Sequence, residues 1–113
     1  MPEKEDKIYL KHILESILDI EDFVSGYTKE SFLEDKKTFN ACIRMFEVIG
    51  EATKRLSGEL RNKYTNVHWK DMAGMRDVLI HDYEGVDLPA VWRIVQNEIP
   101  ILKTNIQKII QEL

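Results

Sequence analysis

The sequence contains few of the residues that interrupt helices or cross-link a chain, with one cysteine, three prolines and five glycines in 113 residues. Because a disulfide needs two thiols, Cys42 cannot form one within the chain, which agrees with a reducing compartment. The N-terminus is charged, and no apolar run approaches the roughly 18 residues needed to cross a bilayer. We therefore expect a cytoplasmic protein with no membrane partner.

Length and composition predict one folded domain over residues 1–113. The chain is 43% hydrophobic and 32% charged, which is typical of a globular protein rather than a disordered one. A second domain is not expected, because chains comfortably form two only above roughly 200 residues. Strand-like alternation of apolar and polar residues does not stand out, so the expected fold class is all-α.

Charge is distributed unevenly along the chain, although its net value of −4 argues against indiscriminate binding to phosphate backbones. Residues 1–35 carry ten acids against four lysines, whereas residues 52–76 carry six basic residues against two acids. The second stretch is a candidate surface for nucleic acid. A solvated run of charges without any partner is an equally common outcome of such a pattern.

Apolar spacing predicts two helices in the first half of the chain. Over residues 5–27, apolar residues recur every three or four positions, which is typical of an amphipathic helix of about six turns. Ser31, with Glu34 three positions later, has the form of a capping box that begins the second helix. That helix should continue to Leu56, where Ser57-Gly58 predicts its end.

Gly50 lies inside the second helix, where glycine costs about 1 kcal/mol relative to alanine. Such a cost favours a close approach by another helix at this position, with a tolerated accident as the alternative. Residues 59–68 should form a short helical turn followed by a loop.

Two more helices are expected in the second half. The first should run from about Trp69 to Tyr83 and end at Gly85, and the second should open at Asp87. The apolar stripe of that last helix comprises Val91, Val95, Ile99, Leu102, Ile106, Ile109 and Leu113. Pro100 is predicted to bend it. The economical architecture is an antiparallel four-helix bundle with an additional short helix.

The segment from Met75 to Tyr83 carries groups suited to cleaving RNA without a metal. A neutral His81 could remove the proton of a ribose 2′-OH, or in its protonated form give one to the leaving oxygen. The permanently charged Arg76 could hold the scissile phosphate and stabilise its transition state. Without further information, an arginine and a histidine five positions apart are more often surface or interface residues, and Tyr83 alone would more often pack.

Helix geometry limits this interpretation. At about 100° per residue, Arg76 and Tyr83 lie within roughly 20° of one face, but His81 is about 140° away from Arg76. The arginine side chain could curl round the helix, the helix could loosen before Gly85, or a symmetric dimer could complete the site. We favour the homodimer, because it also gives a use to polar groups on an otherwise buried helix.

Several short motifs occur together in a specific order. Arg76, His81 and Tyr83 fit the pattern Arg-x4-His-x-Tyr, and around them stand Ile49-Gly-Glu-Ala52, Trp69, Gly74-Met-Arg76 and Val91-Trp92. Through this array the chain resembles the HepT-like branch of the HEPN superfamily over almost its whole length.

The resemblance implies a metal-independent endoribonuclease toxin, normally homodimeric, that is paired with a minimal nucleotidyltransferase antitoxin. It implies that Arg76 and His81 are catalytic, that Asp77 supports them, and that Tyr83 accepts AMP groups from the antitoxin. Phosphate charge added beside Arg76 would occupy that cation and block access of the RNA. Neither a metal nor a cofactor is implied. The acidic stretch 1–35 does not suit an RNA surface, so we assign it to the outer face or the antitoxin interface.

Two interpretations without catalysis compete with this one. A helical interaction module could use the same dimer surface to bind a nucleotidyltransferase and help present its substrate, since related folds serve in that way. A plain four-helix structural protein is the least favoured.

Other candidate groups have simpler explanations. Cys42, between apolar positions of a helix, is more typical of a small core residue than of a nucleophile. His12 and Glu15 have the spacing of a helical metal pair, but the sequence offers no second such pair to complete a di-metal site.

The residues beside the catalytic segment also have two interpretations each. His68 and Trp69 could stack on a base, but we expect Trp69 in the core and His68 at its rim. Glu47 and Glu51, one turn apart, could face the site as a further acid or base. A solvated face, or pairing with Lys54 or Arg55, is the commoner outcome.

Overall fold

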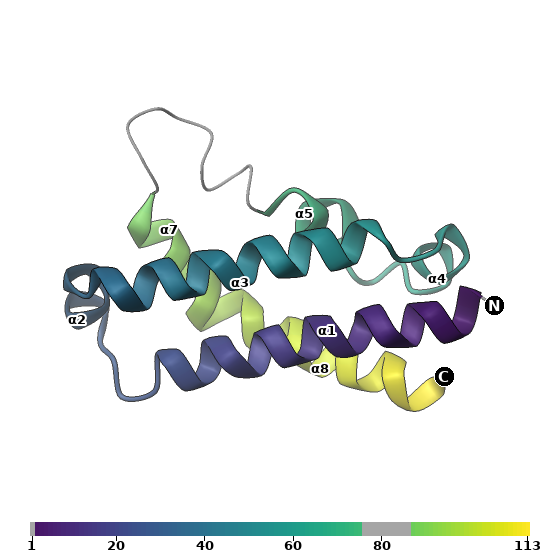
Figure 1. Ribbon diagram of the computed structural model, residues 1–113, viewed down its shortest axis with the longest axis horizontal. Helices are drawn as coiled ribbons and strands as arrows, with labels where there is room; N and C mark the ends of the chain where they lie inside the picture. Colours follow the sequence, from purple (N-terminus) through teal and green to yellow (C-terminus); the bar gives the residue numbers. More distant parts are fainter. Residues whose placement is uncertain (1, 76–86) are drawn as a thin grey trace.

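The computed structural model describes residues 2–75 and 87–113, and every regular element within these ranges is helical. In chain order the elements are α1 (Pro2–Phe23), α2 (Lys29–Glu34), α3 (Lys36–Lys54), α4 (Gly58–Lys63), α5 (Trp69–Ala73), α7 (Leu88–Arg93), η1 (Ile94–Glu98) and α8 (Ile99–Glu112) (Figure 1). The expected all-α fold class is confirmed. Among the described helices, none combines the length and the apolar character needed to span a membrane.

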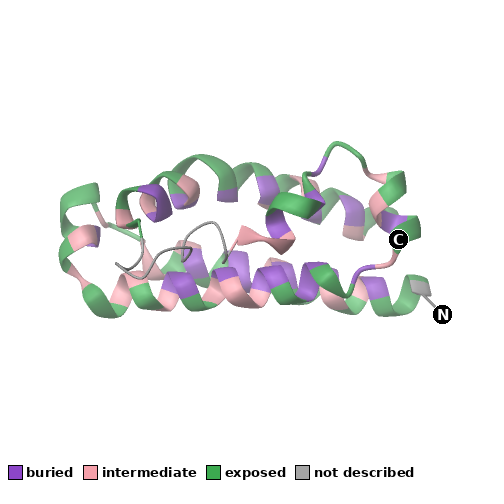
Figure 2. Cartoon of the chain, turned by 90° about the horizontal axis from the view of Figure 1, so that it is seen from above, coloured by how far each residue is buried: buried purple, intermediate pink, exposed green. Residues whose placement is uncertain are grey.

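The core lies where α1, α3 and the last helix meet. α1 and α3 run antiparallel along the length of the molecule, and α8 packs against α1 (Figure 1). Buried residues follow the inward sides of these helices, as Figure 2 shows. Leu10, Ile13, Ile17 and Ile20 of α1 are fully buried, and so are Cys42, Phe46 and Ile49 of α3. The helical spacing of apolar residues therefore identified the buried faces of both helices correctly.

The predicted apolar stripe of the last helix is confirmed, and the backbone is irregular before Pro100, where a bend was predicted. All the stripe residues from Val91 to Ile109 are buried, whereas Leu113 is partly exposed. Asp87 caps the start, accepting a hydrogen bond from the backbone N–H of Ala90 at 3.1 Å. Before Pro100 the helix widens into the π-helical turn η1, in which Ile99 N–H donates to the Ile94 carbonyl oxygen. A proline disrupts the preceding turn, because it has no N–H and its ring crowds the carbonyl four residues earlier.

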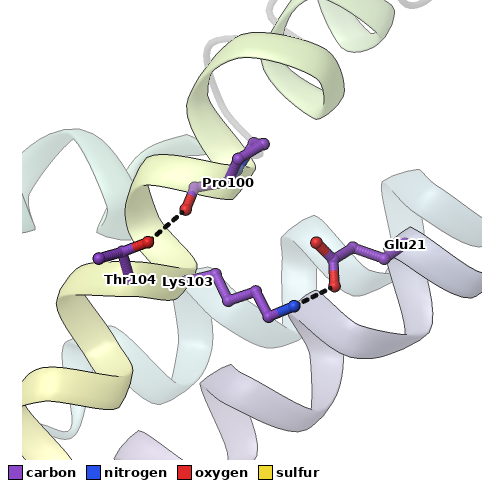
Figure 3. A network of polar contacts seen from close by, with 4 residues as sticks. All are labelled: Glu21, Pro100, Lys103 and Thr104. Carbon is purple, nitrogen blue, oxygen red and sulfur yellow. Dashed lines mark hydrogen bonds and ion pairs between the residues drawn. The ribbon is translucent and has the colours of Figure 1, made fainter.

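Two polar contacts help to fix α8 (Figure 3). Lys103 Nζ lies 2.8 Å from Glu21 Oε1 and ties α8 to α1. Thr104 Oγ1 donates to the Pro100 carbonyl oxygen at 3.2 Å, within the first turns of α8.

The first two predicted helix boundaries are wrong by several residues. α1 ends at Phe23 rather than near Tyr27, and the next helix begins at Lys29 with Thr28 as its N-cap. Thr28 and Ser31 form a capping box in which Ser31 occupies the N3 position. The Ser31 backbone N–H donates to Thr28 Oγ1 at 3.1 Å, and Ser31 Oγ accepts from Thr28 N–H at 2.9 Å. The Ser-x-x-Glu pattern was misleading because a serine at this position replaces the usual glutamate.

The helix predicted to run unbroken from Ser31 to Leu56 is two helices. Asp35 separates them and caps α3 by accepting from Thr38 N–H at 3.1 Å. The Tyr27 hydroxyl also donates to the Asp35 carboxylate, so the turn after α1 is joined to the start of α3. These hydrogen bonds, the one from Tyr27 foremost, hold the pKa of Asp35 below its ordinary value of 3.8.

Ser57 starts a helix instead of ending one. α3 ends at Lys54, and Ser57 is the N-cap of α4, where its Oγ accepts from Leu60 N–H at 3.2 Å. The buried carboxylate of Asp6 in α1 accepts from the Ser57 N–H at 2.8 Å and from its hydroxyl at 2.6 Å. Asp6, 51 positions away, thus helps to make Ser57-Gly58 the start of a helix and not the end of one.

Candidate active site

The four residues expected to carry the chemistry, Arg76, Asp77, His81 and Tyr83, lie outside the described residues. The described structure ends at Met75 on one side of this segment and resumes at Asp87 on the other. It therefore shows how the chain on either side of residues 76–86, the candidate segment, is attached to the rest of the protein.

The short helix α5 is fixed by its own buried side chains. Trp69 and Met72 are buried, and Trp69 Nε1 donates to the Tyr64 carbonyl oxygen at 2.9 Å. The expectation that Trp69 belongs to the core is confirmed. α5 ends at Ala73 with Gly74 as its C-cap, so the continuous helix predicted from Trp69 to Tyr83 is interrupted at Gly74. Glycine favours such an interruption because it has low helix propensity.

Gly50 of α3 allows α5 to come close. A Cβ atom at Gly50 would lie 3.1 Å from the Ala73 carbonyl oxygen and 3.4 Å from that of Met72. Both neighbours are backbone atoms, which cannot move aside as the end of a flexible side chain can. The predicted close approach at Gly50 is confirmed, and it fixes the chain directly before the candidate segment.

The other end of the segment is attached to the same part of the molecule. Asp87 caps α7, and α7 contacts both α2 and α3. Trp92 of α7 packs against Phe32 of α2 with ring centroids 5.0 Å apart. α3 therefore supports the chain both before Arg76 and after residue 86.

The two glutamates of α3 face different environments. Glu51 is exposed and lies 3.8 Å from Arg55, which is one of the two pairings expected for it. Glu47 is partly buried, and its carboxylate lies 3.2 Å from Arg44, a partner that sequence analysis did not name.

A groove runs between α5 and the last helix, with a volume of about 620 Å³. Its walls come from residues 66–75 on one side and residues 93–105 on the other, and we call it the α5–α8 groove. Its apolar surface includes Met72, Met75, Ile94 and Leu102. Met75, the last described residue before the candidate segment, is part of its lining.

Polar side chains surround the α5–α8 groove. They are Asn66, His68, Asp71, Arg93, Glu98 and Asn105. His68 is at the surface as expected, with Nδ1 3.6 Å from the Asp71 carboxylate. Sequence analysis singled out none of the other five. The one local signal was Pro100, because the π-helical turn before it contains both Ile94 and Glu98 of the groove.

The remaining candidate groups have structural surroundings. Cys42 is fully buried, and burial raises the pKa of its thiol to about 12, so it is a protonated core residue and not a nucleophile at neutral pH. His12 is exposed and makes an edge-to-face contact with Tyr9, with ring centroids 6.0 Å apart. Within residues 2–75 and 87–113, no cluster of three or more His, Cys, Asp or Glu side chains is placed to hold a metal ion.

Comparison with known proteins gives a consistent result. The family model described as "Ribonuclease HepT-like" matches residues 13–109. A Methanocaldococcus jannaschii protein named "Putative RNase" is 46% identical over 113 residues, which are 100% of this chain and 93% of that protein. The "Probable ribonuclease HepT" of Thermococcus cleftensis is 44% identical over 103 residues, covering 91% of this chain and 94% of that relative.

A further relative is longer than this chain. It is a Methanocaldococcus jannaschii protein named "Gamma-glutamylcyclotransferase and putative RNase", and it is 49% identical over 110 residues. The match covers 97% of this chain but only 50% of that relative. No solved structure matches the chain. Because the family model covers most of the sequence and two relatives align over nearly their whole length, the chain belongs to the HepT-like ribonuclease family.

Proposed function

We propose that this chain, acting as a single domain, is a metal-independent endoribonuclease toxin that is silenced by a nucleotidyltransferase antitoxin. The observation that carries the proposal is the family match over residues 13–109, which includes the whole Arg-x4-His-x-Tyr motif at Arg76, His81 and Tyr83. The attachment of both ends of this segment to α3 supports it, because catalytic groups must be held on a rigid frame.

The cleavage would use the RNA's own 2′-OH. His81 acts as a general base that takes the 2′-OH proton, or as a general acid that protonates the departing 5′-oxygen. The 2′-oxygen forms a bond to phosphorus while the bond from phosphorus to the 5′-oxygen breaks, leaving a 2′,3′-cyclic phosphate. Arg76 stabilises the charge that develops on the phosphoryl oxygens, and Asp77 orients one of these two groups.

The test is cleavage of RNA in the presence of a chelator. His81→Ala should lower the rate by about 10²- to 10⁴-fold, the usual contribution of a positioned proton-transfer group, and Arg76→Ala should also lower it strongly. His12→Ala is the matched control, because this exposed histidine of α1 makes a ring contact with Tyr9 and has no proposed part in catalysis, so its removal should leave the rate unchanged. RNA carrying 2′-O-methyl groups should not be cut. Wild-type rates in both Arg76→Ala and His81→Ala would refute the assignment.

A homodimer would bring the arginine of one subunit to the histidine of the other. Mixing inactive Arg76→Ala and His81→Ala proteins under exchange conditions tests this directly. If the site is shared, roughly a quarter of the wild-type activity should return, because half of the dimers are mixed and each has one intact site. If each subunit carries its own site, mixing should restore nothing.

Exposed basic residues in α4, in α5 and at the end of α3 support RNA as the substrate. Lys54, Arg55, Lys63 and Lys70 are all exposed, and Lys70 precedes Arg76 by six positions in the sequence. Each lysine that contacts a phosphate should add about one unit to the slope of log affinity against log salt. Lys70→Ala should therefore reduce that slope for uncleavable RNA, whereas Lys29→Ala in α2 should not.

Silencing is proposed to occur by transfer of AMP to Tyr83. The phenolic oxygen attacks the α-phosphorus of ATP, pyrophosphate leaves, and the attached phosphate places negative charge beside Arg76. Incubation with the partner nucleotidyltransferase and ATP should add AMP increments to the intact mass, and Tyr83→Phe should abolish them. Increments that persist in Tyr83→Phe would assign the modification elsewhere.

Expression in cells tests the toxin role. Growth should stop on expression of the wild type and recover with Arg76→Ala or with co-expression of the partner. Harmless expression combined with tight partner binding would instead support the non-catalytic interaction module.

A further inference from the structure

We propose that the α5–α8 groove binds one unpaired base of the RNA and prefers a base with an exocyclic amino group over uracil. The proposal deepens the ribonuclease function and rests on it for the identity of the ligand. It concerns described residues only, and none of them belongs to the proposed catalytic set.

The size and floor of the groove fit a flat heterocycle. Its volume of about 620 Å³ lies within the range of roughly 300–1,000 Å³ that is usual for ligand pockets. Met72, Met75 and Leu102 supply an apolar floor. Methionine side chains are flexible and polarisable, so they adapt to the face of an aromatic ring.

The charges around the groove favour a base rather than a phosphate. Two carboxylates, Asp71 and Glu98, line it, whereas Arg93 is the one permanently charged cation among the lining residues. His68 is already beside Asp71, at 3.6 Å. A phosphate would therefore meet repulsion from two acids, but a neutral base with amino donors meets acceptors.

Several polar groups in the groove are free to bind a ligand. Within residues 2–75 and 87–113, the side chains of Asn66, Arg93, Glu98 and Asn105 make no hydrogen bond or ion pair. Asparagine amides and carboxylates are the side-chain groups that bind the amino-bearing edges of adenine and cytosine. Uracil carries no amino group, so it can offer Glu98 only its N3–H.

Planar side chains stand at the mouth of the groove. The His68 side chain is 80% exposed, and Arg93 is also exposed. Unpaired bases in RNA complexes stack on histidine rings and on guanidinium planes. These two residues come from opposite walls of the groove, and each offers a flat group on which an unpaired base can stack.

The backbone of the last helix is irregular at this groove. η1 spans Ile94–Glu98, and both of its end residues line the groove. Isolated π-helical turns occur often at functional sites, where they shift side chains relative to a regular helix. This irregularity is a second observation, independent of the shape and charge of the groove.

The groove also lies at the correct place along the chain. Met75 is part of its lining and directly precedes Arg76, the proposed phosphate ligand. A base held here would belong to a nucleotide close to the scissile phosphate, so the groove would influence where the RNA is cut.

The first experiment measures kcat/KM on short RNAs that differ only in the base beside the cleaved bond. The wild type should cut adenine-, guanine- or cytosine-containing substrates faster than the uracil substrate. Glu98→Gln should lower the preferred rate up to about tenfold, because the amide oxygen still accepts but no longer carries the charge that strengthens the hydrogen bond, and should affect the uracil rate less. Asn105→Ala should weaken the same preference. Unaltered preferences in both variants would overturn the proposal.

The second experiment measures binding of 2′-O-methyl RNA by NMR, which needs no catalysis and works in the Arg76→Ala background. Shifts at the Asn66 and Asn105 side-chain amides that depend on the base support the groove site even if the chain cuts no RNA. Cleavage without such shifts would remove the groove site and leave the ribonuclease proposal standing.

A third measurement tests whether a second copy of the chain occupies the groove. Ile101→Asp should leave the oligomeric state unchanged, as should the control Ile8→Asp, an exposed isoleucine of α1. Dissociation by Ile101→Asp alone would identify the groove as a subunit contact and contradict base binding.

Discussion

The two sides of the last helix use their residues differently. On the core side, Ile106 is fully buried, and Lys103 at the border of this side pairs with Glu21 of α1. On the groove side, Ile101 is 63% exposed, and Glu98 and Asn105 have no polar partner within the described chain. The comparison teaches that one side of this helix stabilises the fold, while the other side is available for binding.

Replacing one isoleucine on each side gives the largest expected contrast. Ile106→Ala removes fully buried methyl groups and should lower the free energy of unfolding by about 2–5 kcal/mol. Ile101→Ala should change it by less than about 0.5 kcal/mol, because its side chain is mainly in solvent. Urea unfolding monitored by circular dichroism measures both. Equal losses would show that the groove side is also part of the core.

Gly50→Val tests whether the close approach of α5 to α3 matters. The added atoms must push against the backbone carbonyls of Ala73 and Met72, so we expect a loss of about 1–3 kcal/mol and slower RNA cleavage. Gly58→Ala is the control, because a Cβ there meets nothing within 4 Å. Chemical unfolding and RNA-cleavage assays on both variants measure these two effects. Full activity in Gly50→Val would mean that the position of α5 does not affect the site.

Asp6→Asn tests the buried polar contact that joins α1 to α4. The amide keeps the shape of the carboxylate but has one acceptor oxygen in place of two, so it cannot accept from both the Ser57 N–H and the Ser57 hydroxyl, and we expect a loss of about 1 kcal/mol. The exposed neighbour Glu5→Gln should stay within about 0.5 kcal/mol of the wild type. If chemical denaturation shows the same stability for both variants, the contact contributes nothing specific.

Tyr27→Phe should give the smallest effect, and one that depends on pH. The Tyr27 hydroxyl is the main cause of the lowered pKa of Asp35. A carboxyl whose pKa is lowered on folding stabilises the protein above its ordinary pKa, and this stabilisation is lost as pH falls through the folded value. The stability gap between wild type and variant should therefore be constant near neutral pH and narrow below about pH 4. A stability difference that persists in strong acid would come from packing of the Tyr27 ring and not from its hydrogen bond to Asp35.

Local patterns predicted most of the fold. The spacing of apolar residues identified the buried sides of α1, α3 and the last helix, because a helix turns by a constant angle per residue. The boundaries were less predictable. Thr28, and not the neighbouring Ser31, is the N-cap of α2. Ser57 is an N-cap whose backbone N–H is bound by Asp6, 51 positions away in the sequence.

The candidate site likewise has one part that local sequence patterns predicted and one part that they did not. The roles of Arg76, His81 and Tyr83 come from a motif, and they stay predictions because these residues lie outside the described part of the chain. The α5–α8 groove could not be predicted, because Asn66 and Asn105 are 39 positions apart and neither belongs to a recognisable pattern.

The amino-acid sequence by itself determined the helical class, the buried faces and the family motif, because each depends on residue types at short, regular spacings. Only the tertiary structure decided that α5 rests on Gly50, that Ser57 starts a helix, and that two distant segments form one groove. Such features depend on contacts between residues far apart in the chain, and a local pattern does not encode the distance between them.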